Sequence, residues 1–295
     1  MADNCALCPH SCSIDRANQK GRCRAPDDIF IARAALHMWE EPCISGKCGS
    51  GTVFFSGCPL NCVYCQNYDI SQKNFGKKIS SQRLSEIFME LQDKKAHNIN
   101  LVTPTHYADK IVPCVKSARD MGLKIPVVYN TSGYEREETL SALKDTVDIY
   151  LTDFKYWLDE SAKKYSLAPD YPDIAKKALN VMTGQQGELI YDKYGMLQKG
   201  VIVRILLLPN HVYEAKKIAE YVYSNYGNSV IMSLMSQYTP MPDCEKYPEI
   251  NHRVRKKEYD NLVDFALELG AQNVYIQDGT SAQESFIPPF TLEGV

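Results

Sequence analysis

The 295-residue sequence lacks any apolar run close to the roughly 20 residues of a membrane-spanning helix, so it predicts no membrane span. It lacks an excess of charge as well. Its 33 Lys and Arg and 36 Asp and Glu give a formal net charge of −3, which excludes the basic footprint of a nucleic-acid-binding protein. Internal repeats and low-complexity tracts are also lacking. The N-terminus has no charged-then-apolar secretory pattern, so we expect a cytoplasmic protein.

Cysteine is abundant. Eleven cysteines in a reducing compartment favour metal binding over disulfides, and their odd number and clustering favour the same interpretation. Cys58, Cys62 and Cys65 directly follow the apolar run 52–55. Thiolates at this spacing on a tight loop can bind one iron–sulfur cube and leave its fourth iron open for a substrate or cofactor. The alternative is a zinc knuckle or buried free cysteines, but zinc wants four ligands and no histidine lies nearby.

The rest of the chain alternates short apolar runs with longer amphipathic ones. The predicted strands are 52–56, 99–103, 125–129, 147–152, 200–208, 229–234 and 273–276. The predicted helices are 81–95, 108–121, 135–144, 213–225 and 255–269. Strands separated by helices predict a parallel sheet with right-handed crossovers. Six or seven strands favour a partial (β/α)6 barrel over a closed barrel of eight.

We therefore expect three parts in the chain. Residues 1–50 form a cysteine-rich N-terminal extension, 51–280 form the barrel, and 281–295 form a proline-rich tail. The barrel carries an insertion at about 157–199, with a helix around 172–185 and a hairpin that turns at Gly195. Such an insertion often covers a site or meets a partner, although simple decoration is equally compatible with the sequence.

The loop of Cys58, Cys62 and Cys65, with Tyr64 before the third cysteine, resembles the signature of the radical S-adenosylmethionine (SAM) superfamily. The resemblance implies a [4Fe-4S] cluster on these three cysteines, whose open iron binds the amino and carboxylate groups of SAM. The reduced cluster then cleaves SAM to a 5′-deoxyadenosyl radical. The superfamily typically has a six-strand partial barrel, so the resemblance implies a partial (β/α)6 barrel of radical SAM type.

In such barrels the site lies at the C-terminal ends of the strands. The candidate SAM-binding residues there are Tyr64, Thr103, Thr105, His106, Asn130, Thr131, Ser132, Asp153, Lys155, Arg204 and Gln237. Most radical SAM enzymes carry a Gly-Gly-Glu-like segment after the second strand, and here Thr103, Thr105 and His106 stand in its place. Asp153 and Lys155 face one side of their strand, and a salt bridge in solvent is the alternative to a site role. Arg204 lies in an apolar strand and needs a partner, for which the SAM carboxylate is suitable.

A second group of cysteines precedes the barrel. Cys5, Cys8, Cys12 and Cys23 have a spacing that could complete a four-sulfur metal site. Structural zinc or iron, a second iron–sulfur centre and reduced thiols that merely pack all fit this pattern. Cys43 and Cys48 could each replace one of these ligands.

The segments 41–46, 127–135, 153–156 and 233–238 look like the branch related to pyruvate formate-lyase activating enzymes. The resemblance implies an oxygen-sensitive enzyme that takes electrons from flavodoxin or ferredoxin and abstracts hydrogen from a glycine of a partner glycyl radical enzyme. Activases have an acid where this chain has Asn130, and a histidine where it has Thr239. The alternatives are radical modification of another protein, peptide or small metabolite, and a non-catalytic iron–sulfur or zinc scaffold.

Overall fold

The computed structural model describes residues 5–277 and 288–295. Its strands are β1 (Ile29–His37), β2 (Ser50–Phe55), β3 (Lys77–Ile79), β4 (Ile99–Val102), β5 (Val127–Thr131), β6 (Ile149–Asp153), β7 (Ile190–Tyr191), β8 (Leu197–Leu206), β9 (Ile231–Met235) and β10 (Val274–Ile276). Its α-helices are α1 (Pro42–Ser45), α2 (Tyr68–Ser71), α3 (Ser81–Asp93), α4 (Ala108–Asp120), α5 (Glu137–Ala142), α6 (Asp159–Ser166), α7 (Tyr171–Gln186), α8 (Val212–Tyr226) and α9 (Lys256–Glu268). Short 3₁₀ turns lie at Thr105–Tyr107, Gly227–Ser229 and Pro242–Lys246.

The strands form one curved sheet in the order β10-β9-β8-β6-β5-β4-β2-β1-β3. Every neighbouring pair from β2 to β10 is parallel, and these strands follow one another along the sheet in chain order. Among the described residues β10 and β3 do not pair, so the sheet stays open. The prediction of a partial barrel with six or seven parallel strands is confirmed.

Two antiparallel strands at one edge were not predicted. β1 pairs with β2 and β3, so part of the cysteine-rich extension belongs to the sheet. The three alanines of β1, Ala32, Ala34 and Ala35, are fully or almost fully buried. Alanine is depleted in strands, which explains why the local pattern does not reveal β1. The hairpin turn is confirmed: β7 pairs with the start of β8, and Gly195 has a φ of 80°.

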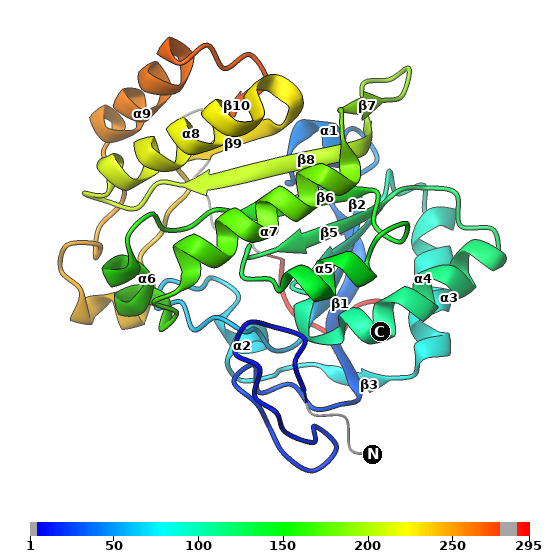
Figure 1. Cartoon of the computed structure of the whole chain (residues 1–295). Helices are drawn as coiled ribbons and strands as arrows, with labels where there is room; N and C mark the ends of the chain where they lie inside the picture. The colour runs from blue at the N-terminus through cyan, green and yellow to red at the C-terminus, as the bar shows by residue number, and fades with distance from the viewer. Residues whose placement is uncertain (1–4, 278–287) are drawn as a thin grey trace.

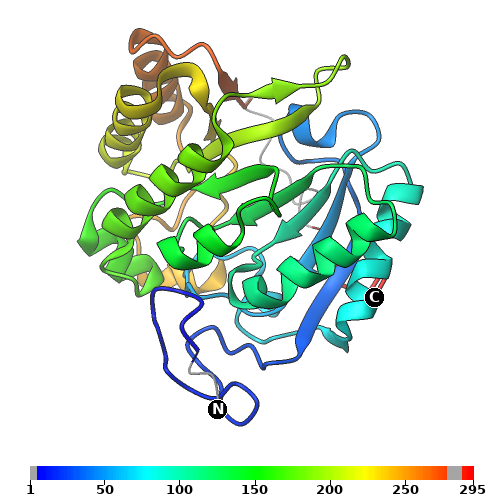
Figure 2. The ribbon, with the colours of Figure 1, turned by 45° about the vertical axis from the view of Figure 1, so that its right-hand side comes forward.

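The larger helices cover the convex face of the sheet, as Figures 1 and 2 show for α3, α4, α5, α7 and α8. Helix α3 illustrates why they form. Ser80 caps it by accepting a hydrogen bond from the Arg83 N–H at 3.1 Å, which satisfies one of its free donors. Leu84, Phe88 and Leu91 recur at helical spacing and are buried together against the sheet. No helix in the described ranges is long and apolar enough to span a bilayer.

The end of the chain returns to the unpredicted strand. The Leu292 N–H donates to the Ala32 carbonyl at 3.1 Å, and the Ala34 N–H donates to the Glu293 backbone carbonyl at 2.8 Å. Phe290 packs edge-on against Phe54, with ring centroids 5.4 Å apart. The tail predicted over 281–295 is thus seen from residue 288 onward, and 281–287 lie outside the described residues.

Candidate functional site

The three cysteines of the loop after β2 line one cavity of about 680 Å³ at the C-terminal ends of the strands. All three are half-buried free thiols. Ser166 donates its hydroxyl to the Cys62 sulfur at 2.9 Å, and the Cys65 sulfur lies 3.2 Å from the Ser71 hydroxyl. Both contacts are with neutral hydroxyl groups. No charged side chain pairs with these two sulfurs in them, so the sulfurs remain available to bind a metal.

Burial determines the protonation of these thiols. It raises the pKa of Cys58 and Cys65 above the usual 9.0, and that of Cys62 to about 11. Thiols in such a place stay protonated until a metal displaces the proton. Three half-buried thiols on one wall of an open cavity fit a [4Fe-4S] cluster with one open iron.

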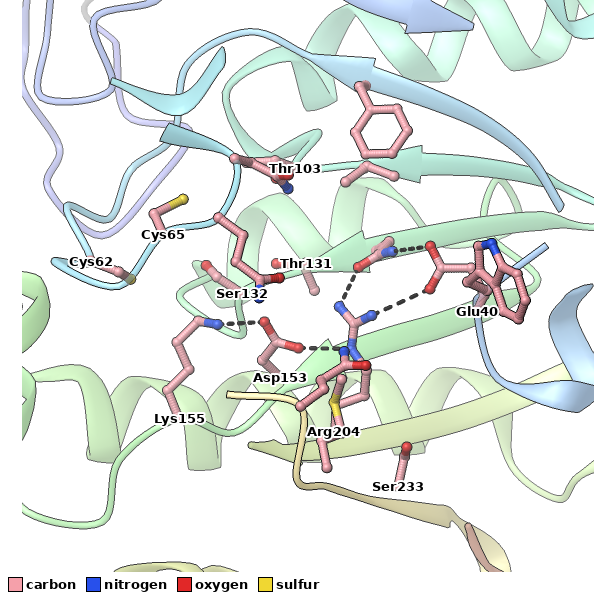
Figure 3. Close-up of a pocket in the computed structure, with 18 of the residues that line it drawn as sticks. Glu40, Cys62, Cys65, Thr103, Thr131, Ser132, Asp153, Lys155, Arg204 and Ser233 are labelled. Carbon is pink, nitrogen blue, oxygen red and sulfur yellow. Dashed lines mark hydrogen bonds and ion pairs between the residues drawn. The ribbon is translucent and has the colours of Figure 1, made fainter. Parts of the chain in front are cut away.

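The opposite side of the cavity is a network of charges at the ends of β5, β6 and β8. Lys155 Nζ donates to Asp153 Oδ2 at 2.5 Å, and Arg204 Nε donates to Asp153 Oδ1 at 2.8 Å. Arg204 also donates to the Asn130 amide oxygen at 2.7 Å and to Glu40 Oε2 at 3.4 Å. Figure 3 shows Cys62 and Cys65 at one end of the pocket and Glu40 at the other, with Asp153 and Arg204 between them.

The network keeps the Asp153 carboxyl charged despite its burial. Burial alone would raise its pKa, but the Arg204 and Lys155 cations more than offset this, so the pKa of Asp153 is lowered. Lys155 responds in the opposite sense: burial favours its neutral form, but the Asp153 charge outweighs it and raises its pKa. The cavity therefore presents fixed charges of both signs.

The structure brings most of the candidate residues to this cavity. Those that line it are Cys58, Cys62, Cys65, Thr103, Asn130, Thr131, Ser132, Asp153, Lys155, Arg204 and Gln237. Thr103 holds a φ of 57°, a conformation that residues other than glycine adopt at a cost of about 1–3 kcal/mol and that is frequent at functional sites. The Ser132 hydroxyl is buried and has no hydrogen-bond partner in the described part of the chain. Such an orphaned group at a cavity wall is suited to a bound polar ligand.

Three candidates lie behind the cavity wall instead. The Tyr64 hydroxyl is 2.6 Å from the Tyr156 hydroxyl, and Thr105 donates to Glu135 Oε1 at 2.6 Å. His106 is 1% exposed and donates from Nε2 to the Ser56 carbonyl at 2.8 Å, just before the cysteine loop. Their contacts support the loop and the wall, and a direct role in SAM binding stays a prediction for them.

Sequence reasoning missed Glu40, which occupies the far end of the cavity. Its Oε1 accepts from Asn100 at 3.1 Å and from Asn130 at 3.4 Å, and Oε2 pairs with Arg204. Arg204, expected to need the SAM carboxylate, already has two carboxylate partners within the chain. The sequence did carry a signal for this residue: Glu40 and Glu41 are adjacent acids directly before Pro42. Acids that become buried need a cationic partner, so this pair could have been matched with Arg204.

The N-terminal cysteines do not line this cavity. Cys5, Cys8, Cys12 and Cys23 lie on the loop that precedes β1, beside the segment that carries the cavity cysteines. All four are free thiols, and Cys8 and Cys23 are buried.

Known proteins resemble this chain in sequence. A family model described as a 4Fe-4S single cluster domain matches residues 44–167, which contain the three cavity cysteines. An uncharacterised protein of Methanocaldococcus jannaschii is 30% identical over 282 residues, covering 92% of this chain and 77% of that protein. A proposed glycyl-radical enzyme activating enzyme of Haemophilus influenzae is 30% identical over 134 residues, covering 44% of this chain and 50% of that protein.

Solved structures resemble the fold. Streptococcus suis SuiB bound to S-adenosylmethionine superposes with a TM-score of 0.51 at 11% identity, over 77% of this chain. This chain spans about half the length of SuiB, with 50% of that chain covered. The fold and the matched domain define an iron–sulfur protein built on a partial barrel. The chain shares a family with the M. jannaschii protein and belongs to the radical SAM superfamily. Its likeness to activating enzymes extends over the 134 residues matched in the H. influenzae protein.

Proposed function

We propose that the chain is an enzyme that cleaves SAM reductively at a cluster held by Cys58, Cys62 and Cys65. When bound, the cluster supplies one electron that converts SAM to methionine and a 5′-deoxyadenosyl radical, which takes a hydrogen atom from the substrate to become 5′-deoxyadenosine. The observation that carries this proposal is the cavity of about 680 Å³, which has three free thiols on one side and the strand-end charges on the other.

The chain's own residues bind and orient SAM. Lys155 offers an ammonium group to the carboxylate of SAM, while Asp153 keeps that ammonium charged and fixed. The unpartnered Ser132 hydroxyl and the Thr103 turn supply hydrogen bonds to the ribose or the amino group.

For the substrate, we propose a glycine residue of a partner glycyl radical enzyme. The H. influenzae relative, itself a proposed activating enzyme of that kind, supports this choice. The second candidate is radical modification of another peptide or protein. The loss of the acid at Asn130 and of the histidine at Thr239 favours it, as does the likeness in fold to SuiB, which has been solved with its precursor peptide SuiA. Flavodoxin or ferredoxin is the proposed electron donor for both.

Anaerobic reconstitution tests the proposal. The full chain is loaded with iron and sulfide, given SAM and dithionite, and assayed for 5′-deoxyadenosine and methionine. We expect both products in equal amounts from the loaded protein. A fully loaded and reduced cluster that yields neither product, whether a candidate glycyl radical enzyme, a candidate peptide substrate or no substrate is added, would favour a non-catalytic scaffold.

A further inference from the structure

The four N-terminal cysteines are gathered by the backbone of their own loop. The Ser13 N–H donates to the Cys5 carbonyl, and the Cys5 N–H donates to the Ile14 carbonyl, both at 3.0 Å. The Cys12 sulfur accepts the Arg22 N–H at 3.4 Å, which brings it next to the residue before Cys23. Gly21 allows a close approach within the turn from 12 to 23, because a Cβ there would lie 3.1 Å from the Cys12 sulfur. The sequence thus folds locally to bring distant thiols together.

The resulting site is sulfur-rich and largely shielded from water. Cys8 and Cys23 are each 5% exposed. The Cys8 thiol lies close enough to Cys12 and Cys23 for the three to interact electrostatically, and Cys23 interacts in the same way with Cys5. None of the four is in a disulfide. Four neighbouring free thiols, two of them buried, are a ligand set for a thiophilic metal centre.

Four free thiols that lie near one another suit either structural zinc or an iron–sulfur cluster. The position of the site favours the cluster. The Cys23 carbonyl accepts the Cys58 N–H at 3.3 Å, and the 4Fe-4S family model matches the segment that carries Cys58. A cluster in that place can exchange electrons with its neighbour, whereas zinc has no redox chemistry.

The N-terminal loop lies against the cavity loop (Figure 1) and is hydrogen-bonded to it. Cys58 donates its N–H to the Cys23 carbonyl at 3.3 Å, which joins a ligand of one set to a ligand of the other. His10 Nε2 donates to the Pro59 carbonyl at 2.9 Å, and Arg24 donates to the Asn61 side chain at 2.7 Å. This docking places the two cysteine sets side by side.

A column of aromatic rings fills the space next to this contact. His10 lies 5.2 Å from Tyr134, which stacks on Tyr171 at 6.1 Å between ring centroids. Tyr156 continues the column at 5.5 Å from Tyr171, and its hydroxyl meets that of Tyr64 beside Cys65. Packed rings of this kind bury apolar surface next to the contact between the loops.

We propose that Cys5, Cys8, Cys12 and Cys23 hold a second iron–sulfur cluster that delivers electrons to the cavity cluster. The inference rests on the proposed function, because it assumes a redox-active cluster at Cys58, Cys62 and Cys65. One electron passes from reduced flavodoxin or ferredoxin to the N-terminal cluster and then to the cavity cluster. The donor is oxidised, the cavity cluster is reduced, the N-terminal cluster returns to its starting state, and no atom is transferred. The Cys23–Cys58 hydrogen bond is the shortest path between the two ligand sets that the contacts provide.

Metal content tests the site without any enzyme assay. We expect about eight irons per reconstituted wild-type chain, and about four after the triple change Cys58→Ala, Cys62→Ala and Cys65→Ala. The double change Cys5→Ser and Cys8→Ser should also leave about four. The exposed Cys48 provides the control, since Cys48→Ser should keep about eight. No iron in the triple variant, or zinc in its place, overturns the proposal.

Electron paramagnetic resonance tests the coupling of the two clusters. The reduced wild-type protein should show a spectrum broadened by interaction between two spins, unlike the sum of the triple-variant and double-variant spectra. Reduced flavodoxin should reduce the cavity cluster in the wild type and fail to do so in the Cys5→Ser, Cys8→Ser variant. A wild-type spectrum equal to that sum, or equal reduction in both proteins, overturns the relay.

These outcomes are separable from failure of the proposed function, which would show as a reduced cavity cluster that yields no 5′-deoxyadenosine. If the double variant does not fold by circular dichroism, the iron content of the triple variant still decides whether the N-terminal site exists.

Discussion

The two cysteine-bearing loops touch each other but have different surroundings. Cys58, Cys62 and Cys65 line a cavity of about 680 Å³ whose lining also includes the charged side chains of Asp153, Lys155 and Arg204. The four N-terminal cysteines lie outside that cavity, with Cys8 and Cys23 buried where their loop packs on the barrel. Three ligands beside an open space leave room for a reacting molecule, whereas four ligands in a closed loop do not. The surroundings of each loop, more than its cysteine spacing, separate a candidate reaction site from a candidate relay.

The largest expected effect comes from the open loop. Changing any one of Cys58, Cys62 or Cys65 to Ala should abolish SAM cleavage, because the cluster loses one of only three protein ligands. The measurement is 5′-deoxyadenosine formed under anaerobic conditions with dithionite. Full product formation by any of these variants would remove the contrast between the two loops.

The charges opposite the open loop come next. Asp153→Asn should lower the free energy of unfolding by about 4 kcal/mol, because it leaves the half-buried Lys155 and Arg204 without their shared carboxylate. It should also raise the KM for SAM. Asp173→Asn is the matched control: its carboxylate is 82% exposed, and loss of its ion pair should cost less than about 1 kcal/mol. Equal losses in the two variants in urea unfolding would show that the cavity network is not stabilising.

Glu135, which accepts hydrogen bonds from Thr105 and Thr131, predicts a pH dependence. It is 2% exposed, and burial raises its pKa from 4.5 to about 7, against the hydrogen bonds from Thr105 and Thr131 that favour its charged form. The pKa of Glu135 is higher in the folded than in the unfolded state. The protonated carboxyl therefore stabilises the fold fully below pH ~4.5, and this stabilisation is lost as the pH rises through about 7.

The measurement is urea unfolding of the wild type and Glu135→Gln at pH 5 and pH 8. We expect the wild type to lose about 3 kcal/mol more than the variant over this interval. Glu138→Gln, an exposed change nearby, should follow the wild type. Parallel pH profiles for the wild type and Glu135→Gln would show that Glu135 is ionised throughout.

The smallest expected effect reports on the contact between the two loops. Gly57 has a φ of 93°, and a Cβ there would lie 2.8 Å from the Cys23 carbonyl oxygen. Gly57→Ala should destabilise the protein by about 2 kcal/mol and lower the iron content. Gly195→Ala has a similar φ of 80° but no atom near its Cβ, so it isolates the backbone strain. Matching effects of the two changes on iron content would mean that the docking of the loops does not support either cluster.

Local patterns in the sequence predicted much of this protein. The parallel strands, the main helices and the turn at Gly195 follow from periodicity and from glycine, which act over a few residues. Strand β1 escaped prediction because its alanines carry little strand signal and only the neighbouring strands decide its pairing. His106 was expected at the mouth since it follows β4, but its side chain turns inward to the Ser56 carbonyl.

The sequence by itself determined the chemistry that the chain can carry: three cysteines on one loop after a strand, and polar residues where parallel strands end. Only the tertiary structure decided which of these groups meet. Glu40 and Arg204 are 164 residues apart, and the Cys23 carbonyl reaches the Cys58 N–H only after the N-terminal loop has packed on the barrel. Such contacts depend on the packing of the whole sheet and its loops, which no local spacing encodes.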